Sequence, residues 1–111
     1  MPSQGDIVLI PLPFTDLSSS KRRPVIVISN NAYHQATTDM VVVAMTSNPT
    51  TTPYSFVITD ADLTSGSLNR PGMVRVDKIY TLSQKLSVKT FGHVDTKTLG
   101  HIRELLHALT A

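Results

Sequence analysis

Residues 40–47, Met-Val-Val-Val-Ala-Met-Thr-Ser, are a continuous apolar run that ends in two hydroxyl side chains. A run of this length and composition predicts a strand buried on both faces of a sheet. Residues 23–29, Arg-Pro-Val-Ile-Val-Ile-Ser, predict a second strand, and Pro24 biases Arg23 towards extended geometry at its start. Residues 72–77, Gly-Met-Val-Arg-Val-Asp, add a cation and an anion two residues apart. These three segments predict a small β-rich domain with one polar site.

The other strand candidates are short segments bounded by turn residues. They are residues 7–11 and 54–58. Residues 86–94 contain Gly92, which predicts a bend. Residues 32–39 fit either a helical turn or an irregular connection. Residues 79–82 either continue the preceding strand or form one of their own, and residues 62–69 have the composition of a loop.

Only the tail is plainly helical. Asp95 or Thr96 can cap it, and Gly100 weakens it by about 1 kcal/mol relative to alanine, so packing against the sheet has to hold it. Five or more short strands with one terminal helix predict a mainly β fold, a small SH3-like barrel, with residues 1–111 as a single domain. The residues that recur at helical spacing are Leu99, Ile102, Leu105, Leu106 and Leu109.

Length and composition bound the protein class. A chain of 111 residues with 41% hydrophobic and 16% charged residues fits one ordinary globular domain rather than a disordered chain. The absence of cysteine excludes disulfides, thiol catalysis and cysteine-ligated metals. The N-terminus lacks a basic region followed by a long apolar core, and no apolar run approaches the roughly 18 residues of a membrane span. We therefore expect a soluble, cytoplasmic protein without membrane attachment.

Basic residues cluster although the net charge is only +2. Lys21, Arg22 and Arg23 end a polar loop, and Arg70 and Arg75 bracket another strand start. Such clustering favours an anionic partner. For Lys21 and Arg22 taken alone, a solvated charge run that aids solubility is the better interpretation.

The candidate reactive pair is Arg75 and Asp77. Residues i and i+2 of a strand share a face, so both side chains can reach one substrate while Val74 and Val76 are buried behind them. The alternative is a simple ion pair, worth at most about 1 kcal/mol if it is exposed. Arginine is a poor acid because its pKa exceeds about 12, so Arg75 is first a stabiliser of negative charge.

Hydroxyl and guanidinium groups at the strand ends could bind phosphate. Thr46 and Ser47 could bond a phosphate or simply end the strand, and Arg23 could grip two phosphate oxygens or cover apolar surface with its stem. The four histidines lie in different segments without metal-ligand spacing, so no metal site and no cofactor are predicted. They are His34, His93, His101 and His107.

The same residues carry a family resemblance. Residues 5–8 (Gly-Asp-Ile-Val), Arg23-Pro24, Thr46-Ser47 and residues 74–77 (Val-Arg-Val-Asp) occur in the order seen in the MazF/PemK/Kid toxins, and residues 13–29 are especially similar to PemK-like members. The resemblance implies an SH3-like barrel and the toxin of a type II toxin-antitoxin system. It further implies a metal-independent mRNA interferase, a sequence-selective endoribonuclease that cleaves single-stranded RNA by attack of the 2′-hydroxyl. Expected partners are RNA, a second copy of the chain and an acidic antitoxin.

The resemblance also maps roles onto residues of this chain. In Kid-like members the Arg-x-Asp pair, here Arg75 and Asp77, is implicated as acid and base. In MazF-like members the arginine and threonine, here Arg23 and Thr46, are the usual functional pair. The expected RNA-binding residues are Lys21, Arg22, Ser47 and Arg70.

The first loop departs from the family pattern. Many members carry Glu or His shortly before the Arg-Pro pair, whereas residues 18–22 here are Ser-Ser-Ser-Lys-Arg. Asp16 is the nearby carboxylate, and no catalytic role is assigned to it.

Two other functions remain open at this point. The first is a non-catalytic toxin that binds a protein target, like the related gyrase poison CcdB, but residues 105–111 lack the aromatic residue that such a helix end uses. The second is a nucleic-acid-binding barrel without catalysis. Such modules often stack bases on exposed aromatic side chains, and this chain has only three Phe, three Tyr and no Trp.

Overall fold

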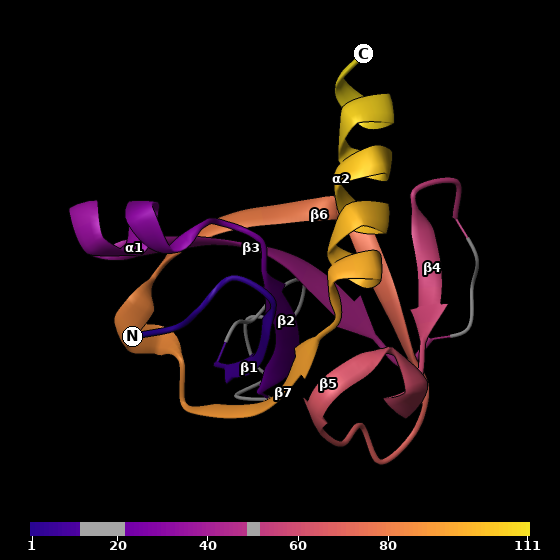
Figure 1. Ribbon diagram of the computed structural model, residues 1–111, viewed down its shortest axis with the longest axis horizontal. Helices are drawn as coiled ribbons and strands as arrows, with labels where there is room; N and C mark the ends of the chain where they lie inside the picture. Colours follow the sequence, from indigo (N-terminus) through magenta and orange to yellow (C-terminus); the bar gives the residue numbers. More distant parts are fainter. Residues whose placement is uncertain (12–21, 49–51) are drawn as a thin grey trace.

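The computed structural model describes residues 1–11, 22–48 and 52–111, and within these ranges seven strands form one curled sheet (Figure 1). All strand pairs are antiparallel, in the order β4-β6-β3-β2-β1-β7-β5. This confirms the predicted mainly β, barrel-like fold with a C-terminal helix. The elements are β1 (Asp6–Ile10), β2 (Arg23–Val27), α1 (Asn31–Ala36), β3 (Asp39–Thr46), β4 (Ser55–Ile58), η1 (Asp60–Asp62), β5 (Leu63–Gly66), β6 (Gly72–Ser83), η2 (Gln84–Leu86), β7 (Lys89–Val94) and α2 (Thr96–Thr110).

Strand β3 lies in the middle of the sheet between β2 and β6. Its central residues are buried on both faces, as its apolar run predicts. Its pairing with β6 contains a register shift, because Val43 lies opposite Ile79 whereas Ala44 lies opposite Arg75. Residues 76–78 of β6 therefore have no partner residue on β3, and the sheet bends at this irregularity.

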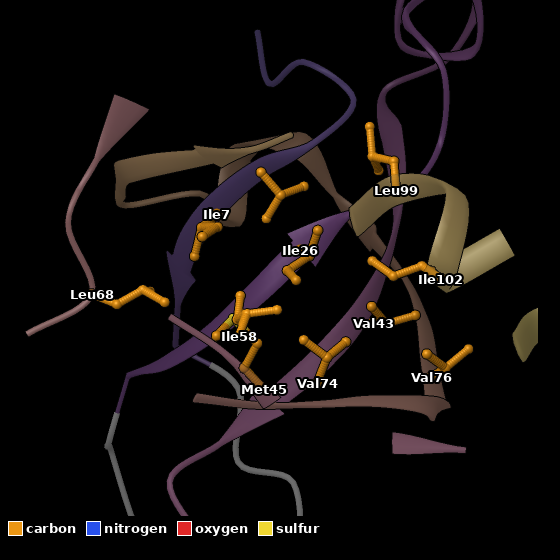
Figure 2. Close-up of a cluster of buried hydrophobic side chains, with 11 residues drawn as sticks. Ile7, Ile26, Val43, Met45, Ile58, Leu68, Val74, Val76, Leu99 and Ile102 are labelled. Atoms are coloured by element: carbon orange, nitrogen blue, oxygen red, sulfur yellow. The ribbon is translucent and has the colours of Figure 1, made fainter. Parts of the chain in front are cut away.

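Two apolar clusters cover the two faces of the sheet. Ile7, Ile26 and Val43 point from one face towards Leu99 and Ile102 at the start of α2 (Figure 2). All five side chains are at least nine-tenths buried, so α2 is held by the packing that its glycine requires. The second cluster consists of Val8, Ile10, Val25, Val27, Met40 and Val42.

Helix α2 begins as predicted. The Asp95 side chain accepts a hydrogen bond from the Thr98 N–H at 2.7 Å, which makes Asp95 the N-cap. Its last turns project beyond the sheet (Figure 1). Among the described residues, no helix is long and apolar enough to cross a membrane.

The structure shows which alternative is correct for residues 32–39 and 79–82. Residues 31–36 form α1, capped by the Asn30 side chain, and β6 runs on without a break to Ser83. The prediction of a loop over residues 62–69 is wrong in part, because residues 63–66 form β5. This strand contains one large apolar residue, Leu63, and exists through its pairing with β7, which no local pattern reveals.

The turn after β5 depends on a glycine. Gly66 has φ +82°, and a Cβ there would clash with the backbone carbonyl of Phe91 on the neighbouring strand. The next residues are pinned, since the Ser67 N–H donates to the Phe91 carbonyl at 3.2 Å and the Leu68 N–H donates to Asp60 Oδ1 at 2.7 Å. Residues 67–71 therefore form an anchored loop.

We expect Gly66→Ala to destabilise the fold by about 2 kcal/mol or more, because it combines a left-handed φ with a backbone clash. Gly100→Ala is the matched control, since a Cβ at Gly100 meets no atom within 4 Å. This second change is expected to stabilise the protein by about 0.5–1 kcal/mol, the helix-propensity gain. Urea unfolding of both variants measures the difference, and equal stabilities would contradict the geometry of the turn.

Candidate functional site

Arg23 and Thr46 lie at the facing ends of two paired strands. Arg23 is the first residue of β2, and Thr46 is the last residue of β3. Val25 lies opposite Ala44, so continuing this antiparallel register by two residues places Arg23 opposite Thr46 on the same face. The Thr46 Oγ1 atom accepts a hydrogen bond from the Asn48 N–H at 3.1 Å, which leaves the hydroxyl proton for a ligand oxygen.

These two residues line a pocket of about 570 Å³. It gathers the end of β3, the start of β2, the anchored loop 67–71 and part of β7. Among the described residues that line it, every ionisable side chain is basic, so the pocket favours an anionic ligand. Its polar and charged lining residues are Arg22, Arg23, Thr46, Ser47, Ser67, Asn69, Arg70 and Lys89.

Most of the RNA-binding candidates meet in this pocket. Arg22, Ser47 and Arg70 come from three different segments and line the same cavity as Arg23. Lys21 lies outside the described residues. The grouping is consistent with the predicted roles, which remain predictions.

Arg75 and Asp77 form a pair outside the pocket lining. Arg75 Nε donates to Asp77 Oδ1 at 3.0 Å and Arg75 Nη2 donates to Asp77 Oδ2 at 2.9 Å. Val74 and Val76 are fully buried, as the alternation of the strand predicts. Arg75 lies opposite Ala44 and is therefore the diagonal neighbour of Thr46 across the β3–β6 pair, at a Cα separation of about 7–8 Å.

The pair has a clear electrostatic effect. Its hydrogen bonds hold the pKa of the Asp77 carboxyl below its usual value, and they raise the pKa of Arg75. Asp77 is therefore ionised at neutral pH, but in this state it is a weak base. Arg75 donates two of its five N–H groups to Asp77. Among the described residues no hydrogen bond from the other three is seen, so these three remain for a ligand.

The sequence did not single out three further residues of the pocket. Lys89 and Phe91 come from β7, and Asn69 comes from the anchored loop. They lie far along the chain from residues 22–24 and 45–47, so no spacing in the sequence links them to Arg23. The pairing of β7 with β1 brings Lys89 and Phe91 alongside, and the pairing of β5 with β7 brings the loop that carries Asn69.

The histidines serve separate local structures. His34 is buried and bonds Ser29 Oγ through Nε2 at 2.6 Å, and His93 Nδ1 lies 2.9 Å from Asp6 Oδ1. His101 packs against the Phe56 ring with centroids 4.0 Å apart, and His107 is exposed. Within the described part of the chain, no group of three or more His, Cys, Asp or Glu side chains is placed to hold a metal ion.

The structure is a curled antiparallel sheet of the barrel class, with a C-terminal helix and a basic pocket at its strand ends. The chain belongs to the PemK-like, MazF-like toxins of type II toxin-antitoxin systems, because the profile of that family matches residues 3–110. This confirms the resemblance seen in the sequence. No curated protein matches the chain in sequence.

Solved structures show the same fold over almost the full length. An endoribonuclease in complex with its cognate antitoxin from a mycobacterial species has 24% identity and a TM-score of 0.80, covering 99% of this chain and 95% of that one. An endoribonuclease from a mycobacterial species has 26% identity and a TM-score of 0.76, with 98% and 90% covered. A MazE–MazF structure from Deinococcus radiodurans has 23% identity and a TM-score of 0.77, with 99% and 95% covered.

Proposed function

We propose that this chain is a toxin endoribonuclease that cleaves single-stranded RNA at the basic pocket without a metal ion. The observation that carries the proposal is the placement of Arg23 and Thr46 in a pocket whose ionisable groups, among the described lining residues, are all basic, beside the Arg75–Asp77 pair. A polyanion is attracted to such a pocket, and its backbone has phosphate and ribose within reach of both pairs. The similar mycobacterial and Deinococcus proteins, described as endoribonucleases or as MazE–MazF, support this class of activity.

In the proposed reaction, the ribose 2′-oxygen attacks phosphorus while Asp77 takes the hydroxyl proton. The Arg23 fork and the Thr46 hydroxyl bind the non-bridging oxygens, and Arg75 stabilises the charge that develops on the phosphate. The 5′-oxygen leaves and takes a proton from solvent. The products are a 2′,3′-cyclic phosphate and a 5′-hydroxyl end.

Substrate binding itself improves Asp77 as a base. In the free protein Arg75 lowers the pKa of the Asp77 carboxyl through two hydrogen bonds. A bound phosphate competes for the guanidinium and brings negative charge towards the carboxylate, and both effects raise the pKa of Asp77. The ion pair therefore keeps Asp77 a weak proton acceptor in the free protein, and RNA binding makes it a stronger one.

The first prediction from this mechanism is full RNA cleavage in EDTA. Arg23→Ala is expected to slow single-turnover cleavage by about 100- to 1000-fold, the cost of losing one transition-state donor. Its thermal stability is expected to stay close to wild type, because Arg23 is half-buried at the start of a strand. Arg103→Ala, an exposed cation on α2, is the control for lost charge. Activity that appears only with added divalent metal would reject the mechanism.

The second prediction separates Asp77 from Arg75. Asp77→Asn is expected to remove cleavage yet keep or tighten RNA binding, because a negative charge near a polyanion is lost. Arg75→Ala is expected to weaken both RNA binding and cleavage. Arg75→Lys is expected to restore the affinity more than the cleavage rate, since lysine keeps the positive charge but not the bidentate guanidinium. Anisotropy gives the affinities, and single-turnover assays give the rates. Near-normal cleavage by Asp77→Asn would leave the two residues as a structural ion pair.

We also propose a cytoplasmic homodimer, each copy a single domain, that an acidic antitoxin silences at this pocket. The basic lining offers charge for an acidic segment, as do Lys21 and Arg22 at the end of the sequence stretch 15–22, and similar proteins are found in complex with an antitoxin. RNA and antitoxin are therefore expected to compete. If the toxin–antitoxin complex bound labelled RNA as tightly as the free toxin does, the shared site would be wrong.

A further inference from the structure

We propose that Phe91 and Asn69 form a subsite for one unpaired nucleobase of the RNA, next to the phosphate that Arg23 holds. The subsite rests on the proposed function for its substrate, but it concerns which base is selected rather than how the bond is cut. Both residues line the same pocket as Arg23 and Thr46. Phe91 is the one aromatic side chain among the described residues of that lining.

An irregularity in β7 places Phe91 there. Ile7 lies opposite Gly92 and Val8 lies opposite Thr90, so Phe91 is an extra residue without a partner on β1. A bulge of this kind redirects a side chain out of the regular alternation, and bulges are common beside active sites. Phe91 is half-buried and packs against the core cluster under α2 while it also lines the pocket. It is therefore a rigid ring with one side supported by the core.

The loop that carries Asn69 is fixed against the same bulge. Ser67 bonds the backbone carbonyl of Phe91, and Leu68 is 92% buried with its N–H bonded to Asp60. Asn69 follows directly, is exposed, and lines the pocket. Its side-chain amide offers both a donor and an acceptor, as the edge of a base requires.

The combination matches the parts of a nucleotide. The four basic side chains of the pocket suit phosphates, a supported aromatic ring suits a base face, and an amide on a pre-formed loop suits a base edge. Because Phe91 comes from β7 whereas Arg23 and Thr46 come from β2 and β3, the base lies on the β7 side of the pocket, next to the phosphate that Arg23 holds. The subsite is therefore one that selects the cleavage sequence.

The test compares Phe91→Leu with Phe56→Leu. Both phenylalanines are half-buried against the same core cluster, but Phe56 lies in another pocket, so the second variant controls for lost packing. Affinity is measured by anisotropy with a labelled single-stranded DNA 12-mer of random sequence, which lacks the attacking 2′-hydroxyl. Phe91→Leu is expected to weaken binding by about 5- to 100-fold, the range of a lost base stack. Phe56→Leu is expected to stay within about twofold of wild type, and Phe91→Trp to retain affinity.

Selection is measured by sequencing the ends cut from a random-sequence RNA pool. Asn69→Ala is expected to broaden the base preference at one position beside the cut, seen as a loss of the preferred base relative to the other three at that position. One outcome overturns the subsite and leaves the nuclease assignment intact. In this outcome wild type cleaves RNA, and the Phe91→Leu and Asn69→Ala variants both bind and cut as wild type does. If wild type binds the DNA without cutting RNA and Phe91→Leu loses affinity, the base subsite stands and the nuclease assignment falls.

Discussion

The pairing of β3 with β6 is the constraint on which the rest of the molecule depends. Ala44 lies opposite Arg75, and continuing that register would place Asp77 opposite Val42, a fully buried residue in the second apolar cluster. A carboxylate there would lose its hydration without a compensating partner. The register shift avoids this cost, because it places Tyr80 opposite Val42 and leaves Asp77 in the irregular segment.

The same shift creates the arrangement of charges. Released from the buried face, the carboxylate of Asp77 folds back onto Arg75, whose side chain is 24% exposed against 31% for Asp77. The pocket at the ends of β2 and β3 keeps only basic ionisable groups among its described lining residues. The negative group that the proposed chemistry needs therefore stands beside the pocket, where it does not repel an incoming polyanion from the phosphate-binding residues.

Local sequence patterns were sufficient to predict the elements whose own apolar side chains form the core. The apolar runs of β2 and β3 and the stripe on α2 were predicted within one or two residues, since their side chains carry the signal themselves. The candidate residues Arg23 and Thr46 followed, because they stand at the ends of those runs. β5, the bulge at Phe91 and the anchor at Asp60 were not predictable. β5 and the bulge exist only through pairing between strands distant in the sequence, and the anchor is a single side-chain contact from Asp60 to the Leu68 N–H that no local pattern predicts.

The pocket has two parts that the sheet supports differently, namely the ends of β2 and β3 and the loop of residues 67–71. Strands β2 and β3 each have neighbours on both sides, and at their ends Arg23 is paired with Ile10 of β1 and Thr46 with Met73 of β6. The loop with Asn69 follows β5, which is the last strand of the sheet and has a partner on one side only. Asn69 itself is exposed, so substitutions of its side chain disturb few buried contacts. If the proposed base subsite is right, its selectivity changes through this edge loop, while the ends of β2 and β3, which lie inside the sheet, keep Arg23 and Thr46 in place.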